Sequence, residues 1–387
     1  MNPDITKWVL GALMIAFFAS ASRAQLQERD PPLSKDKPLF EVDLRKFGYE
    51  RFGDKEAVRP IRIRVDFTDV NGLALAWATA DDLGTHKKTV LPAARPGRLQ
   101  VLLVDARTGD KRGQQEWNVP STWFGFLGLR DGKFITCTGN TIHLFSAGFE
   151  SVRERALGDD SCPPFGSQNV SPSQRSLLLS YFPKDGLRTM ELRDTQTFEV
   201  ISKWTEMPGK REAASASDHW IAGLCGDPSD LCIRGVGQSW RPLHVAWKDV
   251  NAKVMSAPVQ FVTGETFVIE GRHVVVATVD DSTVFTVAPP KGRFAISVKS
   301  TGGSRFAVVE GRMRGLKSAP LDMYPFLSAD RVAVYSLSEP HVICALKLEG
   351  TSPWSPWAIH FDDLAISPDG NLLAVVSDGV LKVYRLP

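Results

Sequence analysis

Four pairs of neighbouring aspartates and one histidine are the residues with which this chain could perform acid–base or metal chemistry. The pairs are Asp81-Asp82, Asp159-Asp160, Asp280-Asp281 and Asp362-Asp363. His360 stands close to the last pair, and a His–Asp cluster can transfer protons or hold a metal ion. Neighbouring aspartates are also common in tight turns, because the carboxylate bonds to nearby backbone N–H groups. We therefore predict turns at these pairs, with no catalytic residue and no metal site.

The familiar catalytic and cofactor motifs are absent from the sequence. It holds no Gly-x-Ser-x-Gly nucleophile turn, no His-Glu-x-x-His zinc helix, no phosphate-binding loop and no dinucleotide fingerprint. The stretch Asp69-Val70-Asn71-Gly72 begins like a calcium loop, but an apolar run replaces the glutamate that such a loop needs. We predict no cofactor.

Two tryptophans are candidates for binding rather than for catalysis. Trp354 and Trp357 lie in the stretch Ser-Pro-Trp-Ser-Pro-Trp, which predicts a rigid loop. An exposed indole on such a loop would suit sugar stacking or a protein-binding hot spot. Packing of the two rings inside the protein is the alternative.

Composition excludes several classes of protein. The 387 residues include 46 Lys+Arg and 44 Asp+Glu, a formal net charge of +2, and 43% are hydrophobic. That apolar content can form a large core and argues against a disordered chain. The balanced charge argues against a nucleic-acid binder, which carries a dense basic face.

The N-terminus has the pattern of a secretory signal. Lys7 precedes an apolar run, Trp8 to Ala19, and small residues follow up to Ala24. The run is shorter than the roughly 20 residues needed to span a bilayer, so we expect cleavage and no stable membrane insertion. Residues 1–24 are the predicted signal peptide, with cleavage after Ala21 as the alternative. The mature protein is then secreted or periplasmic, with a flexible leader over residues 25–37.

An exported chain can use disulfides, and four of the five cysteines are candidates. Cys225 and Cys232 bracket a turn-rich stretch, and a hairpin there would bring them within bonding distance. Cys137 and Cys162 form a second candidate pair. Cys344 lies in an apolar run, which predicts a buried free thiol.

Short apolar runs alternate with turn residues from residue 38 onward, which predicts an all-β fold. The clearest unit is residues 364–387, LAISPDGNLLAVVSDGVLKVYRLP. Pro368-Asp369-Gly370 predicts a tight turn, because Pro presets φ, Asp bonds to the backbone and Gly accepts positive φ. Residues 371–377 and 380–386 then form a second and a third strand, joined by a hairpin turn.

Weaker copies of this unit recur upstream, within residues 65–109, 126–152, 169–204, 211–245, 257–290 and 294–348. Seven units over residues 57–387 give about 47 residues each, near the period of propeller blades. The chain resembles the WD-repeat and YVTN-type seven-bladed β-propellers, through ISPDGNLLAVVSDGVLKVYRL, VDARTGDKRGQQEW and LRDTQTFEVISKW. The Gly-His and Trp-Asp pairs of true WD repeats are absent. The resemblance implies one propeller domain over residues 38–387, although the strand phase in 257–290 stays open.

The last unit has only three strands before the chain ends, and an open strand edge invites aggregation. Residues 38–44, PLFEVDL, alternate apolar and polar side chains as a half-buried strand does. We predict that this segment is the fourth strand of the last blade, which makes the first and last blades neighbours.

Two long loops should then emerge on one face, on either side of the last blade. They are residues 81–98 of the first blade and residues 313–327 of the sixth. Long loops on a rigid scaffold often carry function. Their basic residues Lys87, Lys88, Arg314 and Lys317 are the predicted binding residues for an acidic partner.

We expect an exported, monomeric, non-enzymatic propeller that binds a protein or another macromolecule, and not nucleic acid. Two alternatives remain open at this point. One is a lactonase-like propeller hydrolase with acidic and His residues around the central channel. The other is a carbohydrate-binding module that uses the two loop tryptophans.

Overall fold

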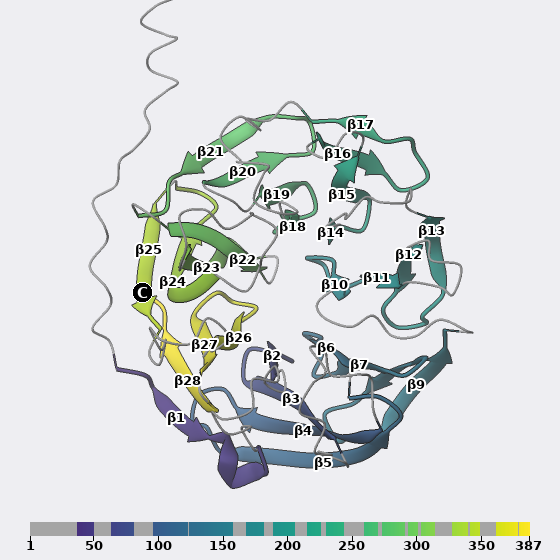
Figure 1. Cartoon of the computed structure of the whole chain (residues 1–387), viewed down its shortest axis with the longest axis vertical. Coiled ribbons are helices and arrows are strands. Elements are labelled where there is room, and N and C mark those ends of the chain that lie inside the picture. Colours follow the sequence, from purple (N-terminus) through teal and green to yellow (C-terminus); the bar gives the residue numbers. More distant parts are fainter. Residues whose placement is uncertain are drawn as a thin grey trace, which may run out of the picture.

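A computed structural model describes most of the chain from residue 37 onward. The described residues are 37–49, 63–80, 96–122, 124–157, 168–181, 189–205, 215–225, 230–243, 259–269, 273–290, 293–300, 303–313, 327–339, 341–348, 361–377 and 379–387. They form seven four-stranded antiparallel sheets arranged around a central axis (Figure 1). The predicted seven-bladed β-propeller is confirmed.

The first four blades follow the chain in order, from the axis outward. Blade 1 is β2 (Arg64–Phe67), β3 (Gly72–Ala80), β4 (Gly97–Asp105) and β5 (Lys111–Val119). Blade 2 is β6 (Phe124–Gly128), β7 (Phe134–Thr138), β8 (Thr141–Phe145) and β9 (Ser151–Ala156). Blade 3 is β10 (Gln168–Val170), β11 (Ser176–Tyr181), β12 (Thr189–Asp194) and β13 (Val200–Thr205). Blade 4 is β14 (Ser215–Ala216), β15 (Trp220–Cys225), β16 (Asp230–Gly235) and β17 (Arg241–Pro242).

The remaining blades complete the ring. Blade 5 is β18 (Val259–Phe261), β19 (Thr266–Ile269), β20 (Val274–Thr278) and β21 (Thr283–Val287), which supplies the strand phase that the sequence left open. Blade 6 is β22 (Arg293–Ser300), β23 (Arg305–Met313), β24 (Leu327–Ser336) and β25 (Val342–Lys347). Blade 7 is β26 (Phe361–Ile366), β27 (Leu372–Ser377), β28 (Val380–Arg385) and, from the other end of the chain, β1 (Phe40–Asp43).

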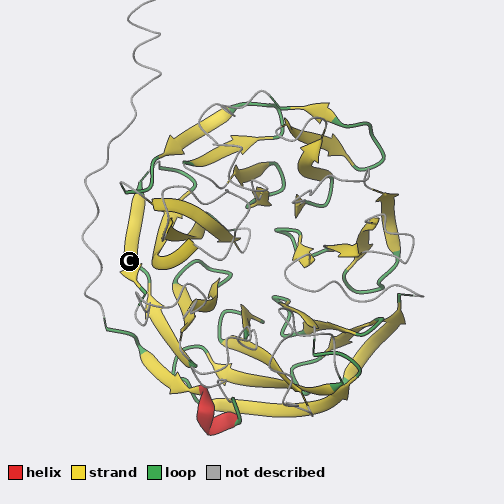
Figure 2. Ribbon diagram, in the orientation of Figure 1, coloured by secondary structure: helices red, strands yellow, loops and turns green. Residues whose placement is uncertain are grey.

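Strand β1 closes the ring as predicted. It lies antiparallel to β28 on the outer edge of blade 7, with Phe40 opposite Val383 and Asp43 opposite Val380. A short 3-10 helix, η1 (Leu44–Phe47), follows at once and is the one helix among the described residues (Figure 2). The N–H of Leu44 donates to the carbonyl of Gly379 at 2.9 Å, so pairing continues past the end of the strand.

The core consists of seven apolar layers within the described residues, one at each boundary between blades. Both faces of each sheet are therefore covered, and its middle strands are apolar without alternation. Strand β3 is buried from Gly72 to Ala78, and β7 is buried throughout. The layer between blades 7 and 1 includes Val42 and Leu44 of the closing segment.

Short turns between the first and second strands of blades 1 to 5 and blade 7 share one face of the propeller, which we call the turn face. It carries residues 68–71, 129–133, 171–175, 217–219, 262–265 and 367–371. A Ser or Thr hydroxyl fixes several of these turns by accepting backbone N–H groups. Ser367 Oγ accepts from Leu372 at 2.8 Å, and Thr263 Oγ1 accepts from Thr266 at 2.9 Å. Among the described residues, no helix has the length and apolar character needed to span a membrane.

Removal of the closing strand should destabilise the whole ring. A chain that begins at Glu56 loses β1 and leaves the edge of β28 unpaired, together with the apolar surface that Val42 and Leu44 cover. We expect its melting temperature to fall by more than about 5 °C, because burial of this apolar surface contributes several kcal/mol to the free energy of unfolding.

The matched control is a chain that begins at Lys37, which removes only the segment before the described residues. Its melting temperature should stay within about 1 °C of that of the full mature chain. Equal melting temperatures for the two truncated chains would contradict closure by β1.

Candidate functional site

Two carboxylates and two cations meet at the inner strands of blades 6, 7 and 1. Asp363 on β26 is buried, and Lys299 Nζ of β22 lies 3.4 Å from its Oδ1. Arg64 Nη1 of β2 lies 4.0 Å from Oδ2 of the same carboxylate. Asp66, two residues after Arg64, is the second carboxylate and points to the same side of its strand. This is the charged cluster of the central channel.

Each carboxylate of the cluster accepts a backbone hydrogen bond from the next blade. Asp363 Oδ2 accepts the N–H of Val65 at 3.1 Å, and Asp66 Oδ2 accepts the N–H of Gly128 at 3.0 Å. The close approach requires a glycine at that position, since a Cβ on Gly128 would lie 2.5 Å from the carbonyl oxygen of Phe67. The two aspartates therefore hold blade 7 to blade 1, and blade 1 to blade 2.

A third link of the same kind uses a hydroxyl. Ser215 Oγ on β14 accepts the N–H of Phe261 on β18 at 3.0 Å, which joins blades 4 and 5. Asn169 Nδ2 on β10 donates to Gln260 Oε1 on β18 at 2.6 Å, which links the inner strands of blades 3 and 5. This side of the ring is linked by neutral groups, while the side formed by blades 6, 7 and 1 is linked by charged ones.

Burial raises the pKa of Asp66 to about 6. The positive charge of Lys299 and the hydrogen bond from Gly128 oppose this shift, whereas the neighbouring Asp363 charge adds to it. A carboxylate with such a pKa exchanges protons near neutral pH, as a general acid or base does. Its lone pairs are already directed at backbone N–H groups of Gly128 and Phe67, which favours a role in holding the blades.

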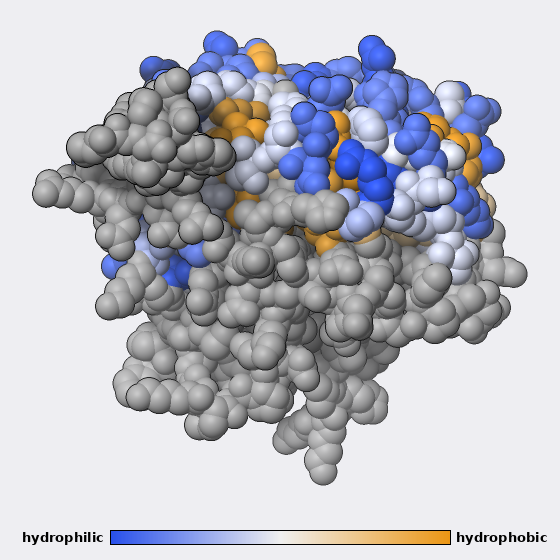
Figure 3. Space-filling model, turned by 90° about the horizontal axis from the view of Figure 1, so that it is seen from above, coloured by the Kyte–Doolittle hydropathy of each residue, from blue (hydrophilic) through white to orange (hydrophobic). Residues whose placement is uncertain are grey.

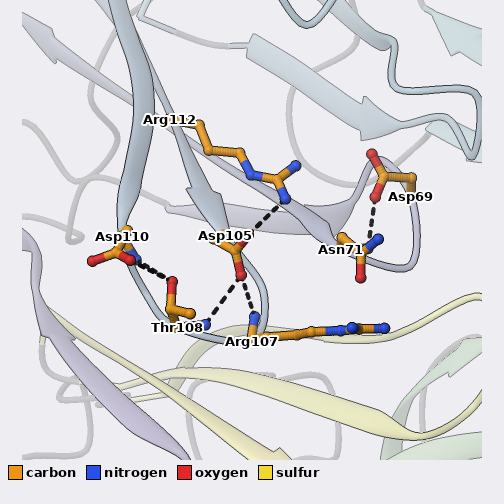
Figure 4. A network of polar contacts seen from close by, with 7 residues as sticks. All are labelled: Asp69, Asn71, Asp105, Arg107, Thr108, Asp110 and Arg112. Carbon is orange, nitrogen blue, oxygen red and sulfur yellow. Dashed lines mark hydrogen bonds and ion pairs between the residues drawn. The ribbon is translucent and has the colours of Figure 1, made fainter.

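A second group of carboxylates in blade 1 also serves the backbone (Figure 4). Asp105 Oδ1 accepts the N–H groups of Arg107 and Thr108, at 2.8 and 3.1 Å, and Oδ2 accepts Arg112 Nη2 at 2.7 Å. The bond from Arg112 is the main cause that lowers the pKa of Asp105 to about 2. Asp194 forms the equivalent turn in blade 3, so this arrangement is a repeated turn and not a separate site.

The predicted turn at Asp280-Asp281 is confirmed, because Asp281 has a positive φ of 72° and its N–H donates to the carbonyl of Thr278. The turn predicted at Asp362-Asp363 is wrong, because both residues lie in strand β26 and the Asp363 carboxylate accepts a hydrogen bond from the neighbouring blade. Among the residues that the structure describes, no group of three or more His, Cys, Asp or Glu could hold a metal ion. The pairs Asp81-Asp82 and Asp159-Asp160, like His360, lie outside the described residues.

The predicted binding residues also lie outside the part of the chain that the structure describes. They are Lys87, Lys88, Arg314, Lys317, Trp354 and Trp357. The strands to which the two basic loops attach end on the face opposite the turn face, on blades 1 and 6, which flank blade 7. Arg98 was expected in the first loop, but it lies in β4 and pairs with Glu116 at 3.3 Å.

The cysteines are described in part. Cys137 and Cys232 are disulfide-bonded, and Cys344 is not. Cys344 is half-buried rather than fully buried as expected, because the strand that carries it lies near the outer edge of blade 6. Cys162 and the side chain of Cys225 lie outside the described part, so the pairings Cys137–Cys162 and Cys225–Cys232 stay predictions.

One cavity opens on the turn face between blades 2 and 3. It measures about 240 Å³ and is lined by three turns, residues 129–131, 173–175 and 194–196. Arg130 is in its wall, and its guanidinium Nε and Nη2 are buried with no hydrogen-bond partner.

The sequence analysis did not identify Arg130, Asp66 or Lys299 as candidate site residues. Alternation in Arg64-Val65-Asp66-Phe67 was the available signal, since it puts two charged residues on one side of an inner strand.

Where its residues are described, the surface seen in Figure 3 is mainly hydrophilic, with smaller hydrophobic areas between. The exposed large hydrophobic residues in the described part are scattered over turns and outer strands. They are Leu39, Val70, Val152, Val200, Ile201 and Val284.

The raised pKa of Asp66 gives a pH test of the channel cluster. The carboxylate has a pKa of about 6 in the folded state and about 3.9 in the unfolded chain. Its protonated form therefore stabilises the fold below pH 4, and this stabilisation is lost as the pH rises through 6. The wild type should lose about 2 kcal/mol relative to Asp66→Asn between pH 4 and pH 7, measured by denaturant unfolding.

Ser215→Ala is the control for this test, because it removes a neutral link between blades. Its effect on the free energy of unfolding should be independent of pH. A constant difference between the wild type and Asp66→Asn across this range would contradict the burial of a titrating carboxylate at this position.

Solved structures with low sequence identity to this chain share its fold. No family model and no curated protein matches the sequence. A solved structure of the mitotic checkpoint complex matches with a TM-score of 0.53 and 14% identity, over 94% of this chain and 97% of that chain. The WD40 domain of Neurospora crassa Pan2 matches with 0.54 and 11%, over 92% and 98%. Chaetomium thermophilum Raptor matches with 0.55 and 11%, over 91% of this chain but 29% of that chain. The chain thus has the fold of a divergent WD-repeat-like propeller.

Proposed function

We propose that the chain is an exported, non-enzymatic propeller that binds a protein partner. The observation that carries the proposal is that the carboxylates of the channel are engaged in hydrogen bonds between blades. Asp66 and Asp363 are acidic groups on the inner strands of blades 1 and 7, and both accept backbone hydrogen bonds from a neighbouring blade. A channel hydrolase needs such groups free to meet a substrate. A propeller whose channel is engaged in this way is better suited to binding at its faces.

The fold favours the same conclusion. Propellers of the WD-repeat type commonly act as protein-interaction scaffolds, and one matched structure is that of the mitotic checkpoint complex. This architecture is therefore used in at least one known assembly.

Two features support export. Residues 1–24 have the charged start, short apolar run and small residues of a cleaved signal. Disulfide-bonded Cys137 and Cys232 suit an oxidising compartment, since thiols are kept reduced in the cytosol.

The proposed contact surface is the face opposite the turn face, where the two long loops begin. Without Arg98, residues 81–95 and 314–326 together hold five basic and three acidic residues, a net charge of +2. The strand ends that carry them lie on blades 1 and 6. Opposite charge on a partner would speed association and set its orientation.

The test combines export and binding in one preparation. The protein is isolated from the extracytoplasmic fraction with an affinity tag at its C-terminus, and its N-terminal residue is read by mass spectrometry. We expect Gln25. Proteins that remain bound are quantified, and the four substitutions Lys87→Ala, Lys88→Ala, Arg314→Ala and Lys317→Ala together should reduce the partner at least tenfold.

The matched control removes four exposed basic residues outside the two loops, three on outer strands and one at the end of β28, by Arg153→Ala, Arg155→Ala, Lys347→Ala and Arg385→Ala. It should retain the partner within twofold. Equal loss in both variants would contradict the proposed contact surface. An uncleaved chain that stays in the cytosol would contradict export.

A further inference from the structure

The hairpin of β23 and β24 in blade 6 is longer than the corresponding hairpins of most other blades. β23 and β24 have nine and ten residues, whereas the middle strands of blades 2, 3, 4, 5 and 7 have four to six. The outer strand β25 ends at Lys347, opposite Arg331 of β24. Residues 311–313 and 327–330 therefore continue beyond the outer strand, and we call them the blade 6 extension.

Two β-bulges lie at the base of the blade 6 extension. The register between β22 and β23 shifts between Ala295 and Ser297, so Ile296 is an extra residue. The register between β23 and β24 shifts next to Glu310, and Asp330 is the extra residue there. Both bulges adjoin Glu310 of the middle strand. A bulge bends its strand and increases the local twist, so the direction of the extension is set at the level of Glu310.

Glu310 is fully buried and contacts two side chains of the neighbouring strand. Arg331 lies directly opposite it, is also buried, and places Nε 3.4 Å from Glu310 Oε2. The hydroxyl of Tyr335 donates to Glu310 Oε1 at 2.9 Å. The Tyr335 ring stacks on Phe306 in the apolar layer between blades 5 and 6. This network therefore connects the base of the extension to the packed core of the blade.

A buried ion pair of this kind is better suited to fixing a geometry than to adding stability. The cost of removing two charges from water can exceed their attraction, and apolar side chains of similar volume often give a fold of equal or greater stability. Hydrogen bonds and ion pairs depend on distance and direction, however. The Glu310 carboxylate meets both Arg331 and Tyr335 only when β23 and β24 keep this arrangement.

We propose that Glu310, Arg331 and Tyr335 form a lock that fixes the direction in which the blade 6 extension leaves the propeller. They are positioning residues, because the loop with Arg314 and Lys317 departs from the strand ends that they hold. The long hairpin of blade 1 is supported differently, since β3 and β4 pair without a register shift and β5 accompanies them to their ends. The consequence for partner binding rests on the proposed function, whereas the lock itself does not.

The first test replaces the network by apolar side chains of similar size, Glu310→Leu, Arg331→Met and Tyr335→Phe together, which we call the apolar variant. Hydrogen–deuterium exchange is measured under native conditions. Exchange in residues 311–313 and 327–330 should accelerate at least about tenfold, because the extension then opens locally. Exchange in the body of the same strands, residues 305–309 and 332–336, should change less than about twofold, and the melting temperature should stay within about 3 °C.

The second test measures the direction of the extension itself. Double electron–electron resonance reports the distance between nitroxide labels attached at Ser328→Cys in the extension and at Asn118→Cys, an exposed position on β5 of blade 1. Cys344 is not disulfide-bonded and is replaced by Cys344→Ser. We expect a narrow distance distribution with the native network and one at least twice as broad in the apolar variant. A network that only stabilised the fold would leave this distribution narrow.

Two further variants are compared with the apolar variant. Glu191 and Arg193 form a buried pair on β12 of blade 3, which belongs to a short hairpin. Glu191→Leu with Arg193→Met is the matched control and should leave the distance distribution and exchange of the extension unchanged. Tyr335→Phe alone removes one hydrogen bond and keeps the ion pair, so exchange in the extension should accelerate by only about two- to tenfold.

An unchanged distance distribution in a folded apolar variant would overturn the lock. A large fall in melting temperature with equal acceleration of exchange throughout blade 6 would also overturn it, because the network would then stabilise the blade as a whole. The preparation described for the proposed function separates the two proposals. Loss of the partner from the apolar variant would support both, whereas retention of the partner despite a broadened distribution would contradict the contact surface and leave the lock intact.

Discussion

The unpaired edge of each innermost strand is the constraint on which the ring depends. An inner strand pairs with the rest of its blade on one side only, and its other backbone groups face the next blade and the channel. Buried N–H groups need partners. Val65, Gly128 and Phe261 find theirs in Asp363, Asp66 and Ser215, each on a neighbouring blade. Hydrogen bonds at the centre and β1 at the rim therefore complement the apolar layers between blades.

This arrangement decides where function can reside. The channel cluster balances Asp66 and Asp363 against Lys299 and Arg64, and the carboxylates are oriented by the backbone. The groups available to a ligand then lie at the two faces. One face carries the ends of the strands that lead to the long basic loops, and the other carries the short turns.

Local patterns predicted most of the fold, because turn chemistry and strand alternation are short-range properties. Ser-Pro-Asp-Gly at residues 367–370 forms the expected turn, and the alternation in residues 38–44 identified the closing strand. Blade 5 could not be phased, since Thr263-Gly264-Glu265 lacks the Pro-Asp-Gly signal. Arg98 was placed in the first loop because Gly97 and Arg98, the first two residues of β4, lack the apolar character of the rest of that strand. Asp66 was missed because its role depends on a neighbouring blade.

Hydrogen–deuterium exchange of single amides tests the central claim most directly. Asp363→Ala should accelerate exchange at Val65, Asp66→Ala at Gly128 and Ser215→Ala at Phe261, each by at least tenfold under native conditions. The other two amides should keep their protection in every variant, because each link joins a different pair of blades. Unchanged exchange at the partner amide, or equal acceleration at all three amides in each variant, would contradict blade-to-blade links made by these side chains.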